Sequence, residues 1–277
     1  MDIGLLTAPF GKDAKFEDIC QWSSKAGAQA LEVMAGPGGH LAADDILKDD
    51  GKKVKKVLAD TGLRISSLAY YRLFNVGMEA EQYVREAKEL VAAVQTLGPD
   101  SCLCLLAGFP APGKNKMQTV REVMPGVFEP IAKEAAKRGV KLAFENWFAT
   151  NLQHLDLWRA LFEVLPNPNV GLNFDPSHLA WQEIDYIAAV AEFRDRIFHT
   201  HAKDVAIFRD KLSRVGVLEG GWWHYVIPGY GCIAWGEYIR QLRKCGYNGV
   251  LSIEHEDGAF NAQEGFEKGI RYLSSLV

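Results

Sequence analysis

Four strand-like segments in the second half of the chain each end in a side chain that can bind a metal ion. They are Glu145 in KLAFENW, Asp175 in VGLNFDPSH, His201 in IFHTHAKD and Glu254 in VLSIEHED. Alternate residues of a strand face the same side, so Asp175 shares a face with Asn173 while Phe174 lies on the other. The same alternation in all four segments predicts a polar face around an enclosed site and an apolar face under covering helices.

These ligand-bearing segments belong to a longer alternation of strand-like and helical patterns. The strand-like runs are DIGLLTA, ALEVM, RISSLAY, SCLCLLAG, KLAFENW, VGLNFDPS, IFHTHAKD and GVLSIEHE. Amphipathic stretches lie between them, at about 16–26, 44–60, 80–96, 117–138, 153–165, 181–193, 235–245 and 262–275. Eight strands, each followed by a helix, predict an α/β fold of the (β/α)8 TIM barrel type. With 277 residues, 48% of them hydrophobic, we expect one domain over 1–277.

In such a barrel the carboxyl ends of the strands converge on one face, so the four candidate ligands would meet there. Three carboxylates with one imidazole suit Mn2+, Mg2+ or Co2+, and Zn2+ is also compatible. We expect one divalent metal ion, with Mn2+ as the first choice. A single strand-end carboxylate is more often a helix cap or an ion-pair partner. Four inward-facing titratable groups, however, would repel one another or lose hydration at a high cost unless something bound them.

One connection, at about 205–234, is too long for an ordinary loop between a strand and its helix. It contains the aromatic run GGWWHY and the turn-rich IPGYG. Long ordered loops at a barrel mouth often act as lids or binding loops. Trp222, Trp223 and Tyr225 would then stack on a sugar ring or exclude water. The alternative is that these aromatics pack the loop down or cover the interface of a homo-oligomer.

Composition narrows the class of partner. The net charge of -4, with both signs interspersed, gives no basic surface for nucleic acid or an anionic membrane, and small polar substrates fit better. Five scattered cysteines without CxxC spacing argue against a disulfide framework and a structural zinc site. The first residues, MDIGLLTAPFGKD, lack a secretory leader and no later segment could span a bilayer, so a cytoplasmic location is expected.

With these residues in place, the whole chain resembles the xylose isomerase-like barrel superfamily of sugar isomerases and epimerases. Three motifs support the resemblance, namely Asp175-Pro-Ser-His178, His201-Ala-Lys-Asp204 and PGYGCIAW at 228–235. The resemblance implies that Glu145, Asp175, His201 and Glu254 hold the metal and that His178 binds a substrate oxygen near it. Free-ketohexose epimerases usually carry a His, Glu and Arg arrangement after the seventh strand. The HAKD form here looks more like the inosose isomerase and general sugar isomerase branch.

The expected chemistry is proton transfer next to a carbonyl group. A metal that chelates a carbonyl oxygen and the neighbouring hydroxyl acidifies the C–H between them and stabilises an enediolate. Glu145 and Glu254 could flank the substrate, one removing the proton and the other returning it. Return to the opposite face gives epimerisation, return to the adjacent carbon gives aldose–ketose isomerisation, and loss of a β-hydroxyl gives dehydration. We therefore expect a sugar isomerase or epimerase acting on a keto-sugar or keto-polyol, with a dehydratase of a keto-inositol or keto-glycoside as the alternative.

Several other polar residues are weaker candidates. Lys203 shares the strand face of His201 and would bind substrate by contacting a hydroxyl or a developing oxyanion, or else stay in solvent. Asp204 would orient His201 or cap the next segment, and His199 would lie deeper as a supporting hydrogen-bonding group. Glu32 and Glu256 are candidates for substrate contacts, although a structural role fits them better.

Two rival classes share the predicted barrel. An endonuclease IV-like phosphodiesterase would need more histidine and carboxylate ligands and a basic groove for DNA, which seven histidines and a negative net charge do not favour. A non-catalytic carbohydrate-binding barrel would have lost one glutamate of the Glu145 and Glu254 pair, and both are present. An enzyme is therefore the expected class.

Overall fold

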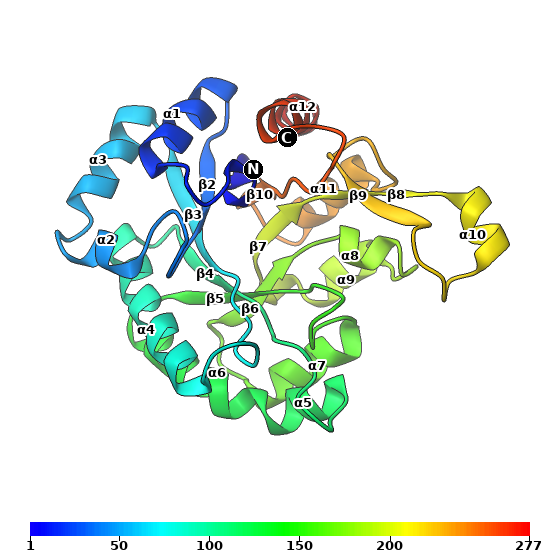
Figure 1. The fold of residues 1–277 in the computed structure, drawn as a ribbon, viewed down its shortest axis with the longest axis horizontal. Coiled ribbons are helices and arrows are strands. Elements are labelled where there is room, and N and C mark those ends of the chain that lie inside the picture. Colours follow the sequence, from blue (N-terminus) through cyan, green and yellow to red (C-terminus); the bar gives the residue numbers. More distant parts are fainter.

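The computed structural model describes residues 1–277, and its centre is a closed barrel of parallel strands (Figure 1). The barrel strands are β1 (Asp2–Leu6), β2 (Ala30–Met34), β3 (Arg64–Tyr70), β4 (Cys102–Leu105), β5 (Lys141–Glu145), β6 (Val170–Phe174), β7 (Ile197–Ala202) and β10 (Val250–Ile253). Each strand pairs with its neighbour in the chain, and β10 closes the ring by pairing with both β7 and β1. The TIM barrel expected from the sequence is confirmed, and its eight strands are the eight predicted segments.

Helices surround the barrel on its outside (Figure 1). They are α1 (Phe16–Ala26), α2 (Ala43–Leu47), α3 (Lys52–Thr61), α4 (Ala80–Leu97), α5 (Lys116–Glu122), α6 (Met124–Lys137), α7 (Leu155–Val164), α8 (Ser177–Ala180), α9 (Tyr186–Glu192), α11 (Trp235–Lys244) and α12 (Ala262–Ser274). Short 3-10 turns, η1 (Ala8–Phe10) and η2 (Arg194–Arg196), precede α1 and β7. None of the helices has both the length and the apolar character needed to cross a membrane.

Two predicted helices are each divided in two, for identifiable reasons. The stretch at 44–60 forms α2 and α3, separated where Gly51 adopts a left-handed φ of 71°. The stretch at 117–138 forms α5 and α6, and Pro125 lies in the first turn of α6. Proline has no N–H to donate to a preceding turn, so Pro125 favours a break at the start of α6, although the same helix also contains Pro130 in its interior.

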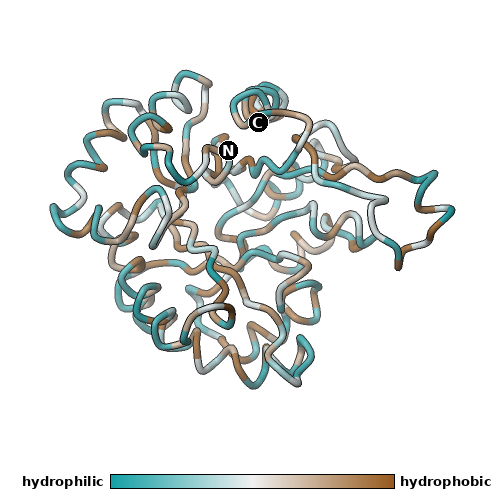
Figure 2. The backbone as a smooth tube through the Cα atoms, viewed as in Figure 1, coloured by the Kyte–Doolittle hydropathy of each residue, from teal (hydrophilic) through white to brown (hydrophobic).

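The hydrophobic core lies between the barrel and its helices. A single cluster of 62 buried residues connects the outward faces of the strands with the inward faces of the helices. Leu172 and Phe174 of β6 belong to this cluster, whereas Asn173 between them joins a polar network inside the barrel. Figure 2 shows hydrophilic residues gathered on the outer turns of the helices. The period-two alternation predicted from the sequence therefore separates a core layer from a polar barrel interior.

A projecting arm is inserted in the connection between β7 and α11. It consists of the antiparallel pair β8 (Asp204–Ile207) and β9 (Trp223–Val226), with α10 (Arg209–Val215) between them. Figure 1 shows the arm extending sideways from the barrel, with α10 towards its far end. The segment expected as a long lid-like loop at 205–234 is therefore largely a hairpin carrying a short helix. Its far end is exposed, since Val217 is 70% exposed and Leu218 fully so.

Candidate active site

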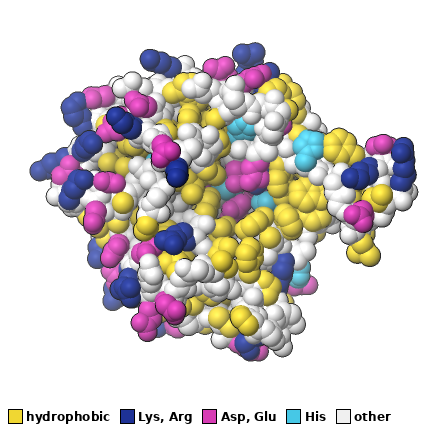
Figure 3. Space-filling model, viewed as in Figure 1, with side chains coloured by type: hydrophobic (Ala, Val, Ile, Leu, Met, Phe, Trp, Pro, Cys, Tyr) yellow, Lys and Arg dark blue, Asp and Glu magenta, His cyan; other side chains and the backbone are white.

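A cavity of about 390 Å³ opens at the carboxyl ends of the barrel strands. Glu145 is the last residue of β5, His201 lies near the end of β7, and Asp175 and Glu254 directly follow β6 and β10. Figure 3 shows acidic side chains in a hollow at the centre of the face, with histidine beside them and hydrophobic side chains around them. The four residues predicted as metal ligands thus share one end of the barrel, as their strand positions required.

His201 brings the predicted ligands into contact. Its Nδ1 atom lies 3.0 Å from Glu254 Oε2, 3.5 Å from Glu145 Oε1 and 3.7 Å from Asp175 Oδ2. His201 and Asp175 are fully buried, and Glu145 and Glu254 are at most 9% exposed. One imidazole nitrogen and three carboxylate oxygens therefore surround a single small volume.

His178 lies in the same cluster and was expected as a catalytic residue that contacts substrate, not as a metal ligand. Ligand atoms of Glu145, Asp175, Glu254 and His178 all lie within 4.8 Å of one another. His178 Nε2 is 3.2 Å from Glu145 Oε1, and its Nδ1 is 2.6 Å from the hydroxyl of Tyr225. His178 comes from α8, the short helix after β6, and it is 1% exposed. The position suits either a further ligand or a group that binds a substrate oxygen beside the metal.

Lys203 is buried within the cluster and is not solvated at the mouth. Its ammonium group lies 2.6 Å from Glu254 Oε2, 3.2 Å from Asp175 Oδ2 and 3.4 Å from Glu256 Oε2. Burial disfavours the charged amine, but Glu254 and Asp175 outweigh it and raise the pKa of Lys203 well above its usual value. One ammonium thus stands among several carboxylates, which leaves an excess of negative charge.

The donor set fits a divalent cation on two observations. Asp175 Oδ2 and His201 Nδ1 are buried and make no hydrogen bond of good geometry, although Lys203 Nζ lies 3.2 Å from the former and Glu254 Oε2 lies 3.0 Å from the latter. Burial opposes ionisation of Glu145, yet the neighbouring His178 and His201 hold its pKa at about 2. Glu145 is therefore ionised near neutral pH, and oxygen-rich sets with one or two imidazoles suit Mn2+, Mg2+ or Zn2+.

Glu32 supports His201 from the side away from the cavity. The residue lies on β2, is fully buried, and accepts hydrogen bonds from Tyr71 and Ser252 at 2.5 and 2.7 Å. Its Oε2 is 3.1 Å from His201 Nε2. Although burial raises its pKa, the neighbouring His201 and His199 lower it below the usual range. Burial lowers the pKa of His201, but Glu32 and Glu254 outweigh it and raise this pKa well above its usual value, so Glu32 holds the Nε2 side of the ring while Nδ1 faces the cluster. Glu32 does not line the cavity, so of the two roles considered from the sequence the structural one is the role that it has.

Asp204 fixes the base of the arm and does not orient His201. Its carboxylate accepts hydrogen bonds from the backbone N–H groups of Val205, Gly229 and Ile233 and from the indole of Trp235. The four distances lie between 2.8 and 3.0 Å. Of the two roles considered from the sequence, the capping role is the one that the structure has.

The arm contributes two aromatic residues to the cavity wall, and both were among the three aromatics predicted to meet a sugar ring. Trp223 and Tyr225 line the cavity together with Phe148, whereas Trp222 does not. Trp222 is 4% exposed and packs against Trp181, with ring centroids 5.9 Å apart. Neighbouring residues of a strand face opposite sides, so Trp222 and Trp223 cannot both face the cavity. The structure therefore does not bring Trp222, which was expected to contact substrate, to the cavity wall.

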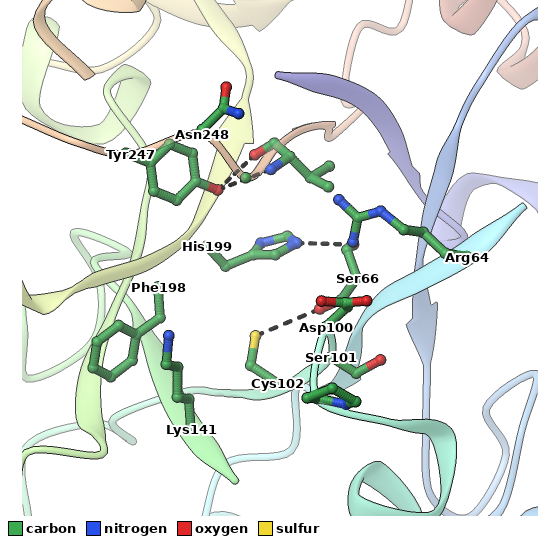
Figure 4. Close-up of a pocket in the computed structure, with 13 residues that line it drawn as sticks. Arg64, Ser66, Asp100, Ser101, Cys102, Lys141, Phe198, His199, Tyr247 and Asn248 are labelled. Carbon is green, nitrogen blue, oxygen red and sulfur yellow. Dashed lines mark hydrogen bonds between the residues drawn. The ribbon is translucent and has the colours of Figure 1, made fainter. Parts of the chain in front are cut away.

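A second cavity, of about 370 Å³, lies at the opposite end of the barrel (Figure 4). His199 lies between Ser66 and Asn173, with ring nitrogens 3.0 Å from each partner, and Cys102 lines the same space. Burial lowers the pKa of His199 to about 4, so the ring is neutral near pH 7. Asp100 is the single carboxylate among the lining residues. His199 also forms a group of possible metal ligands with Glu32 and Cys104, but neither of those two residues lines this cavity. The candidate site is the cavity at the carboxyl ends.

Comparisons with known proteins identify the family of the chain. A family model described as xylose isomerase-like TIM barrel matches residues 20–276. The uncharacterized protein YfiH of Bacillus subtilis is 25% identical over 299 residues, with 95% of each chain covered. An inosose dehydratase of Clostridium beijerinckii is 28% identical over 133 residues, which cover 46% of this chain and 44% of the relative.

Solved structures share the fold at low sequence identity. A probable 3-DHS dehydratase, AsbF of Bacillus anthracis, matches with a TM-score of 0.76, 18% identity and 99% of both chains covered. An IolI protein with a bound zinc atom matches with a TM-score of 0.74, 17% identity and 100% and 99% of the two chains covered. The 3-keto-D-glucoside 4-epimerase YcjR of E. coli matches with a TM-score of 0.72, 15% identity and 99% of both chains covered.

Proposed function

The chain belongs to the xylose isomerase-like TIM barrel family of metal-dependent sugar-modifying enzymes, and within it we propose an isomerase or epimerase of a keto-sugar or keto-polyol. The observation that carries the proposal is the pair Glu145 and Glu254. They stand at the ends of β5 and β10, which are three positions apart around the barrel, and both line the cavity. Two carboxylates that enter one cavity from different strands can share the removal of a proton from a bound substrate and its return.

Glu145, Asp175, His201 and Glu254 would hold the divalent cation, with His178 as a further ligand or a substrate contact. We propose Mn2+, because three carboxylates outnumber the imidazole ligands and oxygen-rich sites favour Mn2+ or Mg2+ over softer metals. When bound there, the cation supplies Lewis acidity that polarises a carbonyl group and stabilises the enediolate left by proton removal. The IolI structure contains zinc, which supports a bound cation in this fold but does not select Mn2+.

Lys203 and His178 complete the proposed machinery. The Lys203 ammonium lies 2.6 Å from Glu254 and 3.3 Å from His178 Nε2, so it would donate a hydrogen bond to substrate oxygen where negative charge develops. The hydroxyl of Tyr225 fixes the His178 ring from its Nδ1 side. With the ring held, His178 Nε2 would orient a substrate hydroxyl beside the reacting carbon.

Dehydration is the second candidate, and Lys203 is the observation that favours it. An ammonium buried beside Glu254 and Glu256 could protonate a leaving hydroxyl after proton removal by a carboxylate. Two similar proteins are named as an inosose dehydratase and a probable 3-DHS dehydratase, which supports dehydration as the second candidate reaction. The same cavity would then accept a keto-inositol or keto-glycoside.

Product analysis with matched variants tests the proposal. Purified enzyme with Mn2+ is incubated with ketoses, keto-inositols and keto-glycosides, and products are separated and identified by NMR. We expect a product of unchanged mass, lost on chelation and reduced at least about a hundredfold in Glu145→Gln and Glu254→Gln. Glu163→Gln, on the exposed side of α7, is the control and should keep full activity. A product lighter by one water would replace isomerisation with dehydration, and unchanged turnover in both variants would falsify the proposed role of the pair.

A further inference from the structure

The active-site cavity has two chemically different halves. Its floor carries the charged groups Glu145, His178, Lys203, Glu254 and Glu256. Its wall consists of six aromatic or aliphatic side chains from four parts of the chain, which are Tyr71, Leu106, Trp147, Phe148, Trp223 and Tyr225. Figure 3 shows the same division, with hydrophobic side chains bordering the acidic hollow. The occupant must therefore match a polar floor and an apolar wall at once.

The rings of the wall are held in place by other rings. Trp223 stacks on Trp181, with centroids 4.4 Å apart and planes 13° from parallel. Phe148 meets both indoles edge-on, at 5.1 Å from Trp181 and 5.7 Å from Trp223. Trp147 lies at the edge of this group, 6.3 Å from Phe148 and 5.8 Å from Phe109. A wall ordered before binding loses little side-chain entropy when a ligand arrives.

A bare polyol would satisfy only the floor. Hydroxyl groups placed against an apolar wall lose hydrogen bonds to water without replacing them. One aromatic ring is enough to cover the C–H face of a single sugar ring, whereas this wall presents rings from the end of β3, the segment after β5 and the arm. Apolar and aromatic surface binds best to apolar and aromatic surface.

We infer that the substrate is a keto-sugar joined to an apolar, planar group, such as an aryl keto-glycoside. The sugar ring lies on the charged floor, and the attached group lies against Trp147, Phe148 and Trp223. This inference rests on the proposed function for the sugar ring. It adds the attached apolar group, a second part of the substrate that no charged residue contacts. The aromatic wall then selects the attached group without taking part in proton transfer.

Binding of unreactive probes tests the inference without turnover. Phenyl and methyl glucosides, in both anomeric forms, are titrated into the Mn2+-loaded protein and binding is followed by calorimetry. We expect the better phenyl glucoside to bind at least about tenfold more tightly than its methyl counterpart, equivalent to about 1.4 kcal/mol. Trp147→Ala should remove most of this preference, and Trp147→Phe, which keeps a ring at the rim, should restore much of it. Phe198→Ala, at the opposite end of the barrel, is the control and should leave the preference unchanged.

The outcomes separate this inference from the proposed function. Equal affinity for phenyl and methyl glucosides would overturn the inference, even where keto-sugars are turned over in the presence of metal. An equal phenyl preference in wild type and Trp147→Ala, confirmed with Phe148→Leu, would also overturn it, because the preference would then arise elsewhere. A phenyl preference that depends on Trp147 supports the inference, and it does so even if product analysis shows dehydration.

Discussion

Replacement of Asp204 should destabilise the protein more than any exposed charge change. Its Oδ1 accepts from Val205 and Ile233, and its Oδ2 accepts from Gly229 and the indole of Trp235. Hydrogen bonds to a charged acceptor contribute about 1.5–3 kcal/mol each, and those that share one acceptor do not add fully. Asp204→Ala leaves four donors without this partner, so we expect a loss of about 3–5 kcal/mol in the free energy of unfolding. Asp204→Asn keeps one acceptor oxygen and should lose about half as much.

Urea denaturation followed by circular dichroism measures the change, and hydrogen exchange of the segment 226–235 shows where protection is lost. Asp210→Ala on α10, whose side chain is 75% exposed, is the control and should stay within about 0.5 kcal/mol of wild type. Equal stability of Asp204→Ala and Asp210→Ala would refute the reasoning, since four buried hydrogen bonds would then have no measurable value. If protection were lost only outside 226–235 and that segment stayed protected, the assignment of Asp204 to the base of the arm would be refuted.

Three further predictions address the metal site and the packing of the barrel. Glu32→Gln should weaken Mn2+ binding about 10–100-fold in calorimetry, because an amide holds His201 Nε2 less well. The control Glu86→Gln, in α4, should bind Mn2+ like wild type, and equal affinities of the two variants would exclude the supporting role of Glu32. Lys203→Met should tighten Mn2+ binding about tenfold or more, because it removes a positive charge that contacts Asp175 and Glu254, and it should lower turnover. Weaker Mn2+ binding by this variant would contradict the prediction. Gly171→Ala should lower the melting temperature, because the new Cβ would lie 2.3 Å from the carbonyl oxygen of Arg196. The control is Gly126→Ala in α6, where a new Cβ meets nothing within 4 Å and the substitution should raise the free energy of unfolding by about 0.5–1 kcal/mol.

Much of the fold and the charged floor could be predicted from the sequence. Parallel strands end at one face, and period-two alternation decides which side chains point inward, so Asp175 and His201 had to meet. Glu32 was undervalued, although ALEVM places it between apolar neighbours at the centre of a buried strand. A carboxylate in that position needs a partner, and the partner, His201, is 169 residues away in the chain.

The arm could not be predicted as well, because its hairpin depends on pairing across a 15-residue gap between β8 and β9. Without the knowledge that Trp223–Val226 is a strand, the sequence could not assign Trp222 and Trp223 to opposite faces. The aromatic wall has the same origin, since Phe148 and Trp223 meet only through the fold. Local patterns thus predict which side chains face inward along one strand, and they do not predict which loops come together above the barrel.

The central claim is that this cavity uses a divalent cation and the Glu145 and Glu254 pair to remove and return a proton beside a carbonyl group. The most direct measurement is exchange of substrate C–H protons with solvent deuterium, followed by NMR on keto-sugars, keto-inositols and keto-glycosides. We predict exchange at one carbon adjacent to the carbonyl, present with Mn2+, absent after chelation and lost in Glu145→Gln or Glu254→Gln. No exchange with any of these substrates, in protein shown by calorimetry to bind Mn2+, would contradict the claim.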